Sequence, residues 1–253
     1  MGIREEFEKR LLEVNTYFEI LKVLELDKPK LSAHDLEKDQ NVEIIFDDRK
    51  INILRSNAFL LLYNLIESTV FNAVTSIFDS INADKHKPKL DYFDVIDAIK
   101  KYWLNNVYKH DEKIKKNTVV NNFMDIVNRI FNESLSLVSN YLKYGGTLDA
   151  EAIETTAIEL GVSVGILKNG FDKNTHGEAF KQIKRHRNWL AHGDKSFAEI
   201  GQDFPYSRLE EWKIYSVEHL VKFIDSIETY IKNEEYVVEA RKKKKGSLVL
   251  QNN

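Results

Sequence analysis

The stretch KQIKRHRNWLAHG, residues Lys181–Gly193, decides how the fold is read, because it marks the end of a helix that carries two side chains suited to phosphate chemistry. Glycine is favoured just after the last turn of a helix, so Gly193 predicts that a helix ends here. Arg187 and His192 lie near that end, and five residues at about 100° each place them about 140° apart. The two side chains therefore lie on different faces but can border one cleft.

A fixed cation beside a group that titrates near neutral pH suits reactions at phosphorus. Arginine holds and neutralises phosphate oxygens, and histidine moves protons. An arginine and a histidine at this spacing are common by chance, so the context has to support the pair. That context is the polar Asn188, the Gly193 stop and the segment Asp194–Phe197. Without it, His192 would be interpreted as a helix-terminal histidine satisfied by the helix dipole.

Length and composition set limits on the fold and its partners. The chain has 253 residues, 43% of them hydrophobic, which is enough for one large domain or two small ones. Only 3 prolines and 10 glycines interrupt it, which favours long helices. The net charge of −3 gives no global argument for nucleic-acid binding, so such a site must be a local patch.

Several classes of site and location are excluded or disfavoured by what the sequence lacks. With 0 cysteines there are no disulfides or thiolate metal sites, as in a reducing compartment. The histidines show no metal-ligand spacing, and no GxxxxGK[ST], GxGxxG or HExxH motif occurs. We therefore predict no metal and no cofactor. The charged N-terminus and the lack of an apolar run of about 18 residues predict a cytoplasmic protein without a membrane span.

Apolar residues recur at three- and four-residue steps along most of the chain, which is the pattern of amphipathic helices. The longest such segment is Ile51–Asn82, in which Ala58–Leu62 is apolar on every side and predicts a central helix. The other predicted helices are Ile3–Leu26, Asp91–Trp103, Thr118–Tyr144, Asp149–Leu160, a helix opened by a Thr175–Glu178 capping box and ended by Gly193, and a helix opened by a Ser207–Glu210 capping box and running to Lys232.

Polar loops and short strands are predicted between these helices. Val42–Phe46 predicts a short strand within the polar segment Asp27–Lys50, and Glu235–Glu239 is a candidate strand beside it. The predicted loops are Ala83–Leu90, Asn105–Asn117, Gly161–Gly177 and Asp194–Pro205.

These elements predict an all-α fold, an up-and-down helical bundle with an extra N-terminal helix and a minor two-stranded β element. The helices that begin near residues 51, 118, 175 and 207 are expected to form the core. No internal repeat or shift in composition separates two domains. We therefore expect residues 1–235 to form one domain, followed by a basic polar tail at residues 236–253.

Glu67 interrupts the apolar run of the central helix. A carboxylate in a buried helix is costly unless it is paired. One interpretation is that Glu67 reaches solvent or bonds to a neighbouring group. The other is that Glu67 pairs with Arg187 and orients it, which would make it part of the catalytic site.

Basic residues near the Arg187–His192 pair form a candidate RNA-binding surface. They are Lys184, Arg185, His186 and Lys195. His186 precedes the arginine and is a neighbour rather than a catalyst. Two other basic segments, the lysines of Ala83–Leu90 and the run Arg241–Lys245, are either solvated charge or an accessory grip on the RNA backbone.

The segment RNWLAHGDKSFAEIG, residues 187–201, resembles the signature of the HEPN superfamily (higher eukaryotes and prokaryotes nucleotide-binding). That signature is an arginine, a polar residue, three further residues and a histidine. The chain is most similar to the stand-alone prokaryotic HEPN-like nucleases, and Phe7–Leu21, Phe59–Val70 and Gly146–Gly161 also resemble segments of that family. Residues 27–50 and 236–253 lie outside the resemblance.

The resemblance implies a HEPN-like helical bundle, a homodimer, and a metal-independent ribonuclease of toxin–antitoxin or anti-phage systems. It also supports the pairing of Glu67, because the matching family segment carries a glutamate. RNA would be the substrate, and an antitoxin or regulatory protein a further partner. Arg187 and His192, assisted by Asn188, would cleave RNA through its own 2′-OH. The alternative is a non-catalytic HEPN-like module that binds RNA or protein. Transfer chemistry on nucleotides is disfavoured, because the sequence has no phosphate-binding glycine loop.

Overall fold

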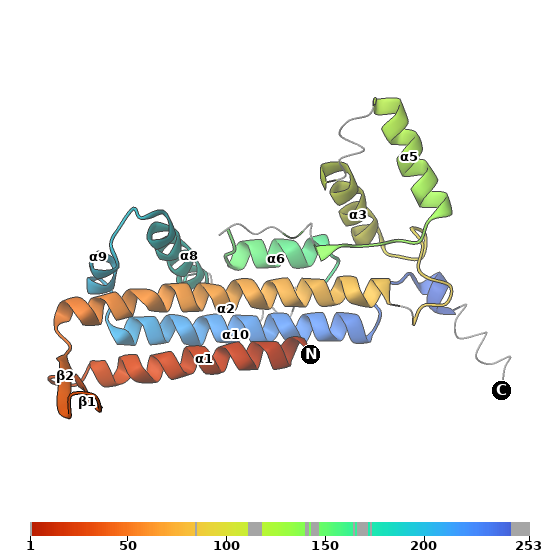
Figure 1. Ribbon diagram of the computed structural model, residues 1–253. Coiled ribbons are helices and arrows are strands. Elements are labelled where there is room, and N and C mark those ends of the chain that lie inside the picture. The colour runs from red at the N-terminus through yellow and green to blue at the C-terminus, as the bar shows by residue number, and fades with distance from the viewer. Residues whose placement is uncertain are drawn as a thin grey trace, which may run out of the picture. The chain divides into compact units, whose positions relative to one another are not determined.

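In the computed structural model the described residues are 2–83, 85–110, 118–139, 142, 147–163, 165, 172 and 174–243. Helices make up most of this part of the chain (Figure 1), which confirms the predicted all-α fold. In chain order the elements are α1 (Ile3–Leu24), β1 (Lys30–Asp35), β2 (Gln40–Ile45), α2 (Asp48–Asn82), α3 (Asp97–His110), α5 (Val119–Asn132), α6 (Ala150–Glu159), α8 (His176–His192), α9 (Phe197–Gln202) and α10 (Tyr206–Lys232).

The described residues fall into two compact units. The first lies within Met1–Thr69, Tyr144–Glu151 and Phe171–Val221, and the second within Val70–Lys143, Ala152–Gly170 and Lys222–Asn253. The long helices α2 and α10 each contribute residues to both units. The candidate site lies in the first unit. A single domain over residues 1–235 stays a prediction.

The first unit is built around α1 and the first halves of α2 and α10. The face of α1 that carries Phe7, Val14, Phe18 and Leu21 is buried. The hydroxyl of Tyr17 donates a hydrogen bond of 2.6 Å to the backbone carbonyl of Leu54, which fixes α1 against α2. Burial of this apolar surface is the main stabilising contribution to such a bundle.

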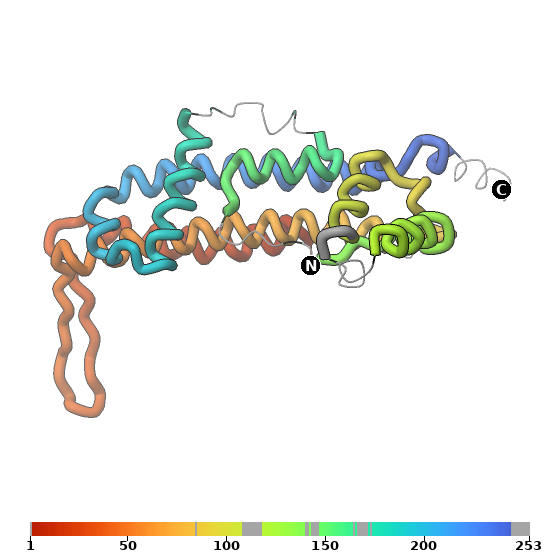
Figure 2. Tube along the Cα trace, turned by 90° about the horizontal axis from the view of Figure 1, so that it is seen from above, coloured from red at the N-terminus to blue at the C-terminus, as the bar shows by residue number. Residues whose placement is uncertain are grey.

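The predicted minor β element is confirmed, but its partner strand was predicted wrongly. β2 pairs with β1 in an antiparallel hairpin whose register runs from Lys30 opposite Ile45 to Asp35 opposite Gln40. The hairpin extends away from the helices that it connects (Figure 2). Val237 forms an isolated bridge with Val95 instead, and residues 239–243 are helical. Local pairing was favoured because a short loop closes a hairpin at little entropic cost.

Two predicted helix ranges in the second unit are wrong. The predicted helix Asp91–Trp103 begins only at Asp97 and continues to His110, so that part of the predicted loop Asn105–Asn117 is helical. The carboxylate of Asp91 accepts hydrogen bonds from the backbone N–H groups of Phe93 and Asp94, at 2.7 and 3.1 Å, and thereby holds a turn. Aspartate commonly competes with a helix in this way.

The predicted helix Thr118–Tyr144 is also too long, because α5 ends at Asn132. Beyond it, the side chain of Asn82 binds the backbone of Leu137 twice, accepting from its N–H at 3.1 Å and donating to its carbonyl at 2.7 Å. These bonds satisfy the backbone outside a helix. None of the described residues of α5 is buried, so α5 is not the core helix that was predicted. The predicted Gly145–Gly146 stop lies outside the described residues.

The segment after the motif helix is more ordered than predicted. The short helix α9 lies within Asp194–Pro205 and begins with a capping box. Ser196 Oγ accepts a hydrogen bond from the N–H of Glu199 at 3.3 Å, and Glu199 Oε2 accepts one from the N–H of Ser196 at 2.7 Å. A Cβ at Gly201 would lie 1.8 Å from the carbonyl oxygen of Asn52. Only glycine therefore permits this approach of α9 to α2.

Neither capping box predicted from the sequence forms. Thr175 precedes α8, but its side chain makes no cap hydrogen bond and instead contacts Asp172 and His176. Helix α10 begins at Tyr206, which places Ser207 inside the helix, and Glu210 accepts a hydrogen bond from the Tyr206 hydroxyl at 2.7 Å. The predicted end of α10 at Lys232 is confirmed.

Helix α2 is long and apolar enough, by composition, to cross a membrane. However, 56% of its most apolar window is buried inside the protein. A central helix in a helical bundle has the same composition, because it is packed on most sides. This burial supports the predicted role of α2 as the central helix of the bundle.

Candidate functional site

Helix α8 carries the arginine and histidine motif on its last turns. Its inner face buries Phe180, Ile183 and Leu190, which anchor the helix in the first unit. Gly193 has a φ of 74° and donates its N–H to the carbonyl of Trp189, which confirms the predicted stop. His192 is therefore the last helical residue, and its side chain is exposed.

Arg187 points toward α2. Its guanidinium carbon lies 4.5 Å from the centroid of the Tyr63 ring, and its Nη1 donates a hydrogen bond of 3.0 Å to Oδ1 of Asn188. The hydroxyl of the buried Tyr63 accepts a hydrogen bond of 3.2 Å from the N–H of Leu148. A cation over a tyrosine face is attracted by the ring quadrupole. Tyr63 and Asn188 therefore hold the guanidinium from two sides.

Asn188 connects the arginine to the face on which His192 lies. It follows Arg187 by about 100° and precedes His192 by four residues, or about 40° around the helix. The side chains of Arg187 and Asn188 are both half-buried, whereas His192 is exposed. Positive, neutral polar and titratable groups are thus arranged in sequence around the end of one helix.

Glu67 lies near this group but makes no direct ion pair with Arg187 among the contacts of the described residues. Tyr63 precedes Glu67 by four residues and lies on the same ridge of α2. Burial raises the pKa of the Tyr63 hydroxyl, the hydrogen bond from Leu148 lowers it, and then the charge of Glu67 raises it while that of Arg187 lowers it. Both charges therefore act on Tyr63, which stands where a direct pair had been predicted.

Sequence reasoning missed Tyr63 as part of the site. Its position four residues before Glu67 was the available signal, because that spacing places both on one side of α2. The signal was obscured because aromatic residues in a central helix are usually core residues, and Tyr63 is indeed 1% exposed.

The residues predicted to bind RNA do not share one environment. Lys184 is half-buried and donates a hydrogen bond to Asp149, so its charge is paired within the fold. Arg185 and Lys195 are exposed, and both lie over the indole of Trp189, at 4.3 and 4.4 Å from the ring centroid. Trp189, which the sequence analysis did not single out, thus holds two exposed cations beside the end of α8.

His186 lies in the core and not on the surface that was predicted to bind RNA. It is 5% exposed and stacks on Phe59, with ring centroids 4.8 Å apart. Its Nδ1 lies 2.7 Å from the carbonyl oxygen of Gln182. Burial, as the largest effect, lowers the pKa of His186, which keeps the ring neutral. This placement argues against the predicted contact with RNA.

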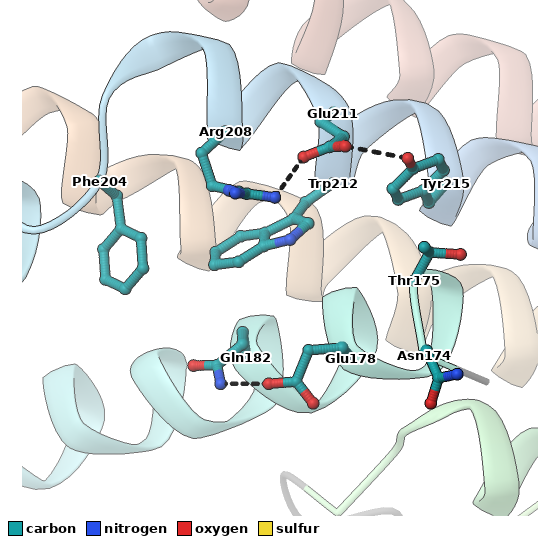
Figure 3. Close-up of a pocket in the computed structure, with 9 residues that line it drawn as sticks. All are labelled: Asn174, Thr175, Glu178, Gln182, Phe204, Arg208, Glu211, Trp212 and Tyr215. Atoms are coloured by element: carbon teal, nitrogen blue, oxygen red, sulfur yellow. Dashed lines mark hydrogen bonds and ion pairs between the residues drawn. The ribbon is translucent and has the colours of Figure 1, made fainter. Parts of the chain in front are cut away.

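A pocket of about 450 Å³ lies between the first half of α8 and the first half of α10 (Figure 3). It is lined by three aromatic side chains and by charged and amide side chains, namely Asn174, Thr175, Glu178, Gln182, Phe204, Arg208, Glu211, Trp212 and Tyr215. None of these residues was predicted to be functional. Their positions are scattered over 42 residues of sequence, so no local motif could have indicated the pocket.

The described residues contain no group of three or more histidine, aspartate and glutamate side chains placed to hold a metal ion. The end of α8 carries a guanidinium held by Tyr63 and Asn188, an exposed imidazole, and two further exposed cations.

Comparison with known proteins gives one match. Residues 2–236 match the family model described as HEPN_MAE_28990-like HEPN, which covers nearly the whole chain. No curated protein and no solved structure matches the chain. The matched range includes α8 and the Arg187–His192 pair, together with α2 and its Tyr63 and Glu67.

Proposed function

Because the chain belongs to this HEPN family, we propose that it is a metal-independent endoribonuclease. The family is helical and is associated with ribonuclease-type or nucleotide-related functions. The observation that carries the proposal is the hydrogen bond from Arg187 to Asn188 beside the exposed His192. Because Arg187 and His192 both lie on the last turns of α8, a phosphate-binding cation and a proton-transfer group are present at one helix end.

The proposed reaction uses the nucleophile that RNA itself carries. The 2′-oxygen attacks the adjacent phosphorus, the bond from phosphorus to the 5′-oxygen breaks, and the proton of the 2′-OH is transferred away while the leaving oxygen gains one. His192 takes or gives one of these protons. Arg187 stabilises the negative charge that builds up on the phosphoryl oxygens. The products are a 2′,3′-cyclic phosphate and a 5′-OH end.

Asn188 and Glu67 have supporting roles in this proposal. Asn188 accepts a hydrogen bond from Arg187. Its proposed role in the reaction is to bind a phosphate oxygen or to position His192 once substrate is bound. Glu67 is the nearby carboxylate on α2, and its charge raises the pKa of the hydroxyl of Tyr63, over whose ring Arg187 lies. Its negative charge favours the arrangement in which the guanidinium remains beside α2 before substrate binds.

One histidine does not readily act as base and acid in the same step. A homodimer that brings two copies of the α8 end together across a two-fold axis would supply the second histidine. We therefore propose a homodimer with RNA as its substrate. An anti-phage or toxin role, with an antitoxin or regulatory protein as partner, fits a nuclease of this family in the cytoplasm.

The alternative function is that of a non-catalytic module that binds RNA or protein. It is favoured by the half-buried position of Arg187, whose guanidinium already contacts Tyr63 and Asn188. An arginine that only ties α8 to α2 would need no substrate. The two functions differ in whether the exposed His192 is needed for a reaction, since His192 makes no contribution to the core.

The test is cleavage of total RNA and transfer RNA by purified wild type, Arg187→Ala and His192→Ala in the presence of EDTA, with the product ends mapped. The proposal requires that wild type alone cleaves and leaves cyclic phosphate ends. Loss of cleavage on addition of EDTA would contradict the metal-independent mechanism. RNA binding by all three folded proteins, without cleavage by any, would support the binding module.

A further inference from the structure

Three aromatic side chains contribute to the walls of the pocket between α8 and α10. Phe204 and Trp212 lie with ring centroids 5.3 Å apart, and the ring of Tyr215 lies 4.7 Å from that of His176. Trp212 is 7% exposed and is held in place by packing against Phe59 and Phe204. A volume of about 450 Å³ is in the range of pockets that enclose small molecules.

The polar side of the pocket contains one carboxylate that is fully engaged. Arg208 Nη1 donates to Glu211 Oε2 at 2.6 Å, and the hydroxyl of Tyr215 donates to Glu211 Oε1 at 2.9 Å (Figure 3). Both oxygens of Glu211 are thus satisfied by side chains of α10. Glu211 therefore orients Arg208 and Tyr215 and is not the main group for a ligand.

The second carboxylate has acceptor capacity left for a ligand. Gln182 Nε2 donates to Glu178 Oε1 at 2.5 Å. Within the described part of the chain no hydrogen bond reaches Glu178 Oε2, and Glu178 is exposed at the pocket wall. An ionised carboxylate only accepts hydrogen bonds. A ligand that binds here must therefore present N–H or O–H donors to Glu178.

The charge of the pocket excludes a phosphate as its ligand. Glu178 and Glu211 together carry two negative charges, whereas Arg208 is the one cation among the nine lining side chains. A phosphate would be repelled, while a neutral ring with N–H donors would be attracted. Nucleobases that are recognised in single-stranded RNA are unstacked, held by aromatic side chains and hydrogen-bonded along their edges.

The pocket and the end of α8 lie along one side of the same helix. Glu178, Gln182, Arg185, Trp189 and His192 follow one another at steps of four, three, four and three residues. Such spacing keeps side chains on one stripe of a helix. Gln182 and His192 are ten residues apart in sequence, or about 15 Å along the axis. A single strand can therefore contact the pocket and the histidine together, with its phosphates passing the exposed Arg185.

We propose that this pocket binds an unstacked guanine of the RNA substrate, a few nucleotides from the bond that is cleaved. Guanine is the base whose Watson–Crick edge carries two adjacent donors, N1–H and the N2 amino group, which one carboxylate can accept together. Glu178 is the acceptor, and the aromatic side chains enclose the ring. The inference rests on the proposed ribonuclease function for its biological meaning, but the binding of the base does not depend on catalysis.

The first experiment measures binding of guanosine, inosine and adenosine to the purified full chain by isothermal titration calorimetry. Inosine keeps N1–H but lacks the N2 amino group, so it tests the second hydrogen bond alone. We expect guanosine to bind at least about tenfold more tightly than inosine and adenosine, because a hydrogen bond to a charged acceptor is worth about that factor or more. Equal binding of guanosine and adenosine would overturn the proposal.

Glu178→Gln supplies the matched variant, since it keeps the shape of the side chain and removes the charge. It is expected to weaken guanosine binding by about tenfold or more. The control is Glu13→Gln, which makes the same change at an exposed position of α1. Wild-type affinity in Glu178→Gln, with circular dichroism showing an intact fold, would also overturn the proposal.

Cleavage of oligonucleotides that differ in the position of a single guanine separates this inference from the proposed function. Wild type should cleave at a fixed distance from the guanine, and Glu178→Gln should cleave without that preference. Guanosine binding without cleavage of any RNA would support the pocket and refute the ribonuclease. Cleavage that is insensitive to the position of guanine would refute the pocket and leave the ribonuclease standing.

Discussion

The guanidinium carbon of Arg187 lies 4.5 Å from the centroid of the Tyr63 ring, which places the proposed catalytic arginine against helix α2. The contact involves a ring that is itself fixed, because Tyr63 is buried and its hydroxyl accepts from the N–H of Leu148. Tyr63 therefore has two separable roles. Its ring positions the arginine, and its hydroxyl satisfies a backbone group.

Two substitutions at Tyr63 separate these roles. Tyr63→Phe keeps the ring but leaves the N–H of Leu148 without its acceptor, which should lower the free energy of unfolding by about 1–3 kcal/mol while cleavage persists. Tyr63→Leu also removes the ring face, and cleavage per folded molecule should fall by about tenfold. Urea denaturation and single-turnover cleavage measure the two effects. Equal activity of both variants would show that the ring does not position Arg187.

The pH dependence of stability should contain a contribution from His186. Burial lowers its pKa, so between its folded and unfolded pKa values the unfolded chain binds more protons than the folded protein. The contribution of neutral His186 to the free energy of unfolding is therefore complete above the pKa of histidine in the unfolded chain, about 6.5. It is lost as the pH falls below that pKa. We expect His186→Phe, which preserves stacking on Phe59, to lose less stability than wild type between pH 7.5 and pH 5.5.

Urea denaturation at these two pH values measures the effect. The control is His34→Asn on the exposed hairpin, which should lose as much stability as wild type. An unchanged pH dependence in His186→Phe would mean that burial does not lower the pKa of His186 below its value in the unfolded chain.

Gly193 ends α8 and Gly201 lies within α9, and replacing each by alanine should cause a different kind of damage. Gly201→Ala places a Cβ 1.8 Å from the backbone oxygen of Asn52, so the helices must separate, at a cost of about 1–3 kcal/mol or more. Gly193→Ala meets no atom within 4 Å, but its φ of 74° costs a non-glycine residue about 1 kcal/mol. We expect Gly201→Ala to be the less stable variant in denaturant unfolding.

Activity should rank these two variants in the reverse order. Gly193 ends α8 directly after His192, so strain there displaces the histidine, whereas folded Gly201→Ala keeps the end of α8. Single-turnover cleavage at a temperature where both are folded provides the comparison. Full activity of Gly193→Ala would show that the position of His192 does not depend on the left-handed turn.

The end of α8 could be predicted from the sequence, whereas the residues that pack around it could not. Gly193 marks the end of α8 because a left-handed turn favours glycine, and the spacing from Arg187 to His192 follows from helix geometry alone. Tyr63 and the α8–α10 pocket depend on which helices pack together. The residues that meet there are distant in sequence: Leu148 binds Tyr63, and Trp212 and Gln182 line the same pocket. Hydrophobic periodicity describes each helix separately and does not predict which helices pack together.

The errors in the predicted helices have a common physical cause. The segments around Asp91 and Leu137 are held by side chains that bind the backbone, Asp91 in a local turn and Asn82 from the end of α2. Such bonds compete with helix formation and depend on atoms that the local pattern does not reveal. The two capping boxes predicted at Thr175 and Ser207 do not form, whereas one forms at Ser196, where the chain changes direction. The same pattern of serine or threonine and glutamate occurs at all three places, so the pattern alone does not show where a helix begins.

The cations around α8 should differ in their effect on RNA binding, although all were predicted to contact RNA. Arg185 and Lys195 are exposed over Trp189, so each can neutralise a phosphate and release counterions. Lys184 is paired with Asp149, and its charge is already compensated within the fold. In a His192→Ala background, Arg185→Ala and Lys195→Ala should each reduce the slope of log affinity against log salt by about 0.7.

Lys184→Ala should leave that slope unchanged and instead lower the free energy of unfolding, because it leaves Asp149 without its partner Lys184 in a half-buried position. Fluorescence anisotropy with a labelled single-stranded RNA, between 50 and 200 mM salt, measures the slope for each variant. Trp189→Leu should reproduce the loss of both cations' contributions, since the indole is what holds them in place. A slope that falls for Lys184→Ala as much as for Arg185→Ala would mean that RNA binding breaks the ion pair between Lys184 and Asp149. The RNA would then follow the α2 side of α8 and not the stripe of side chains from Glu178 to His192.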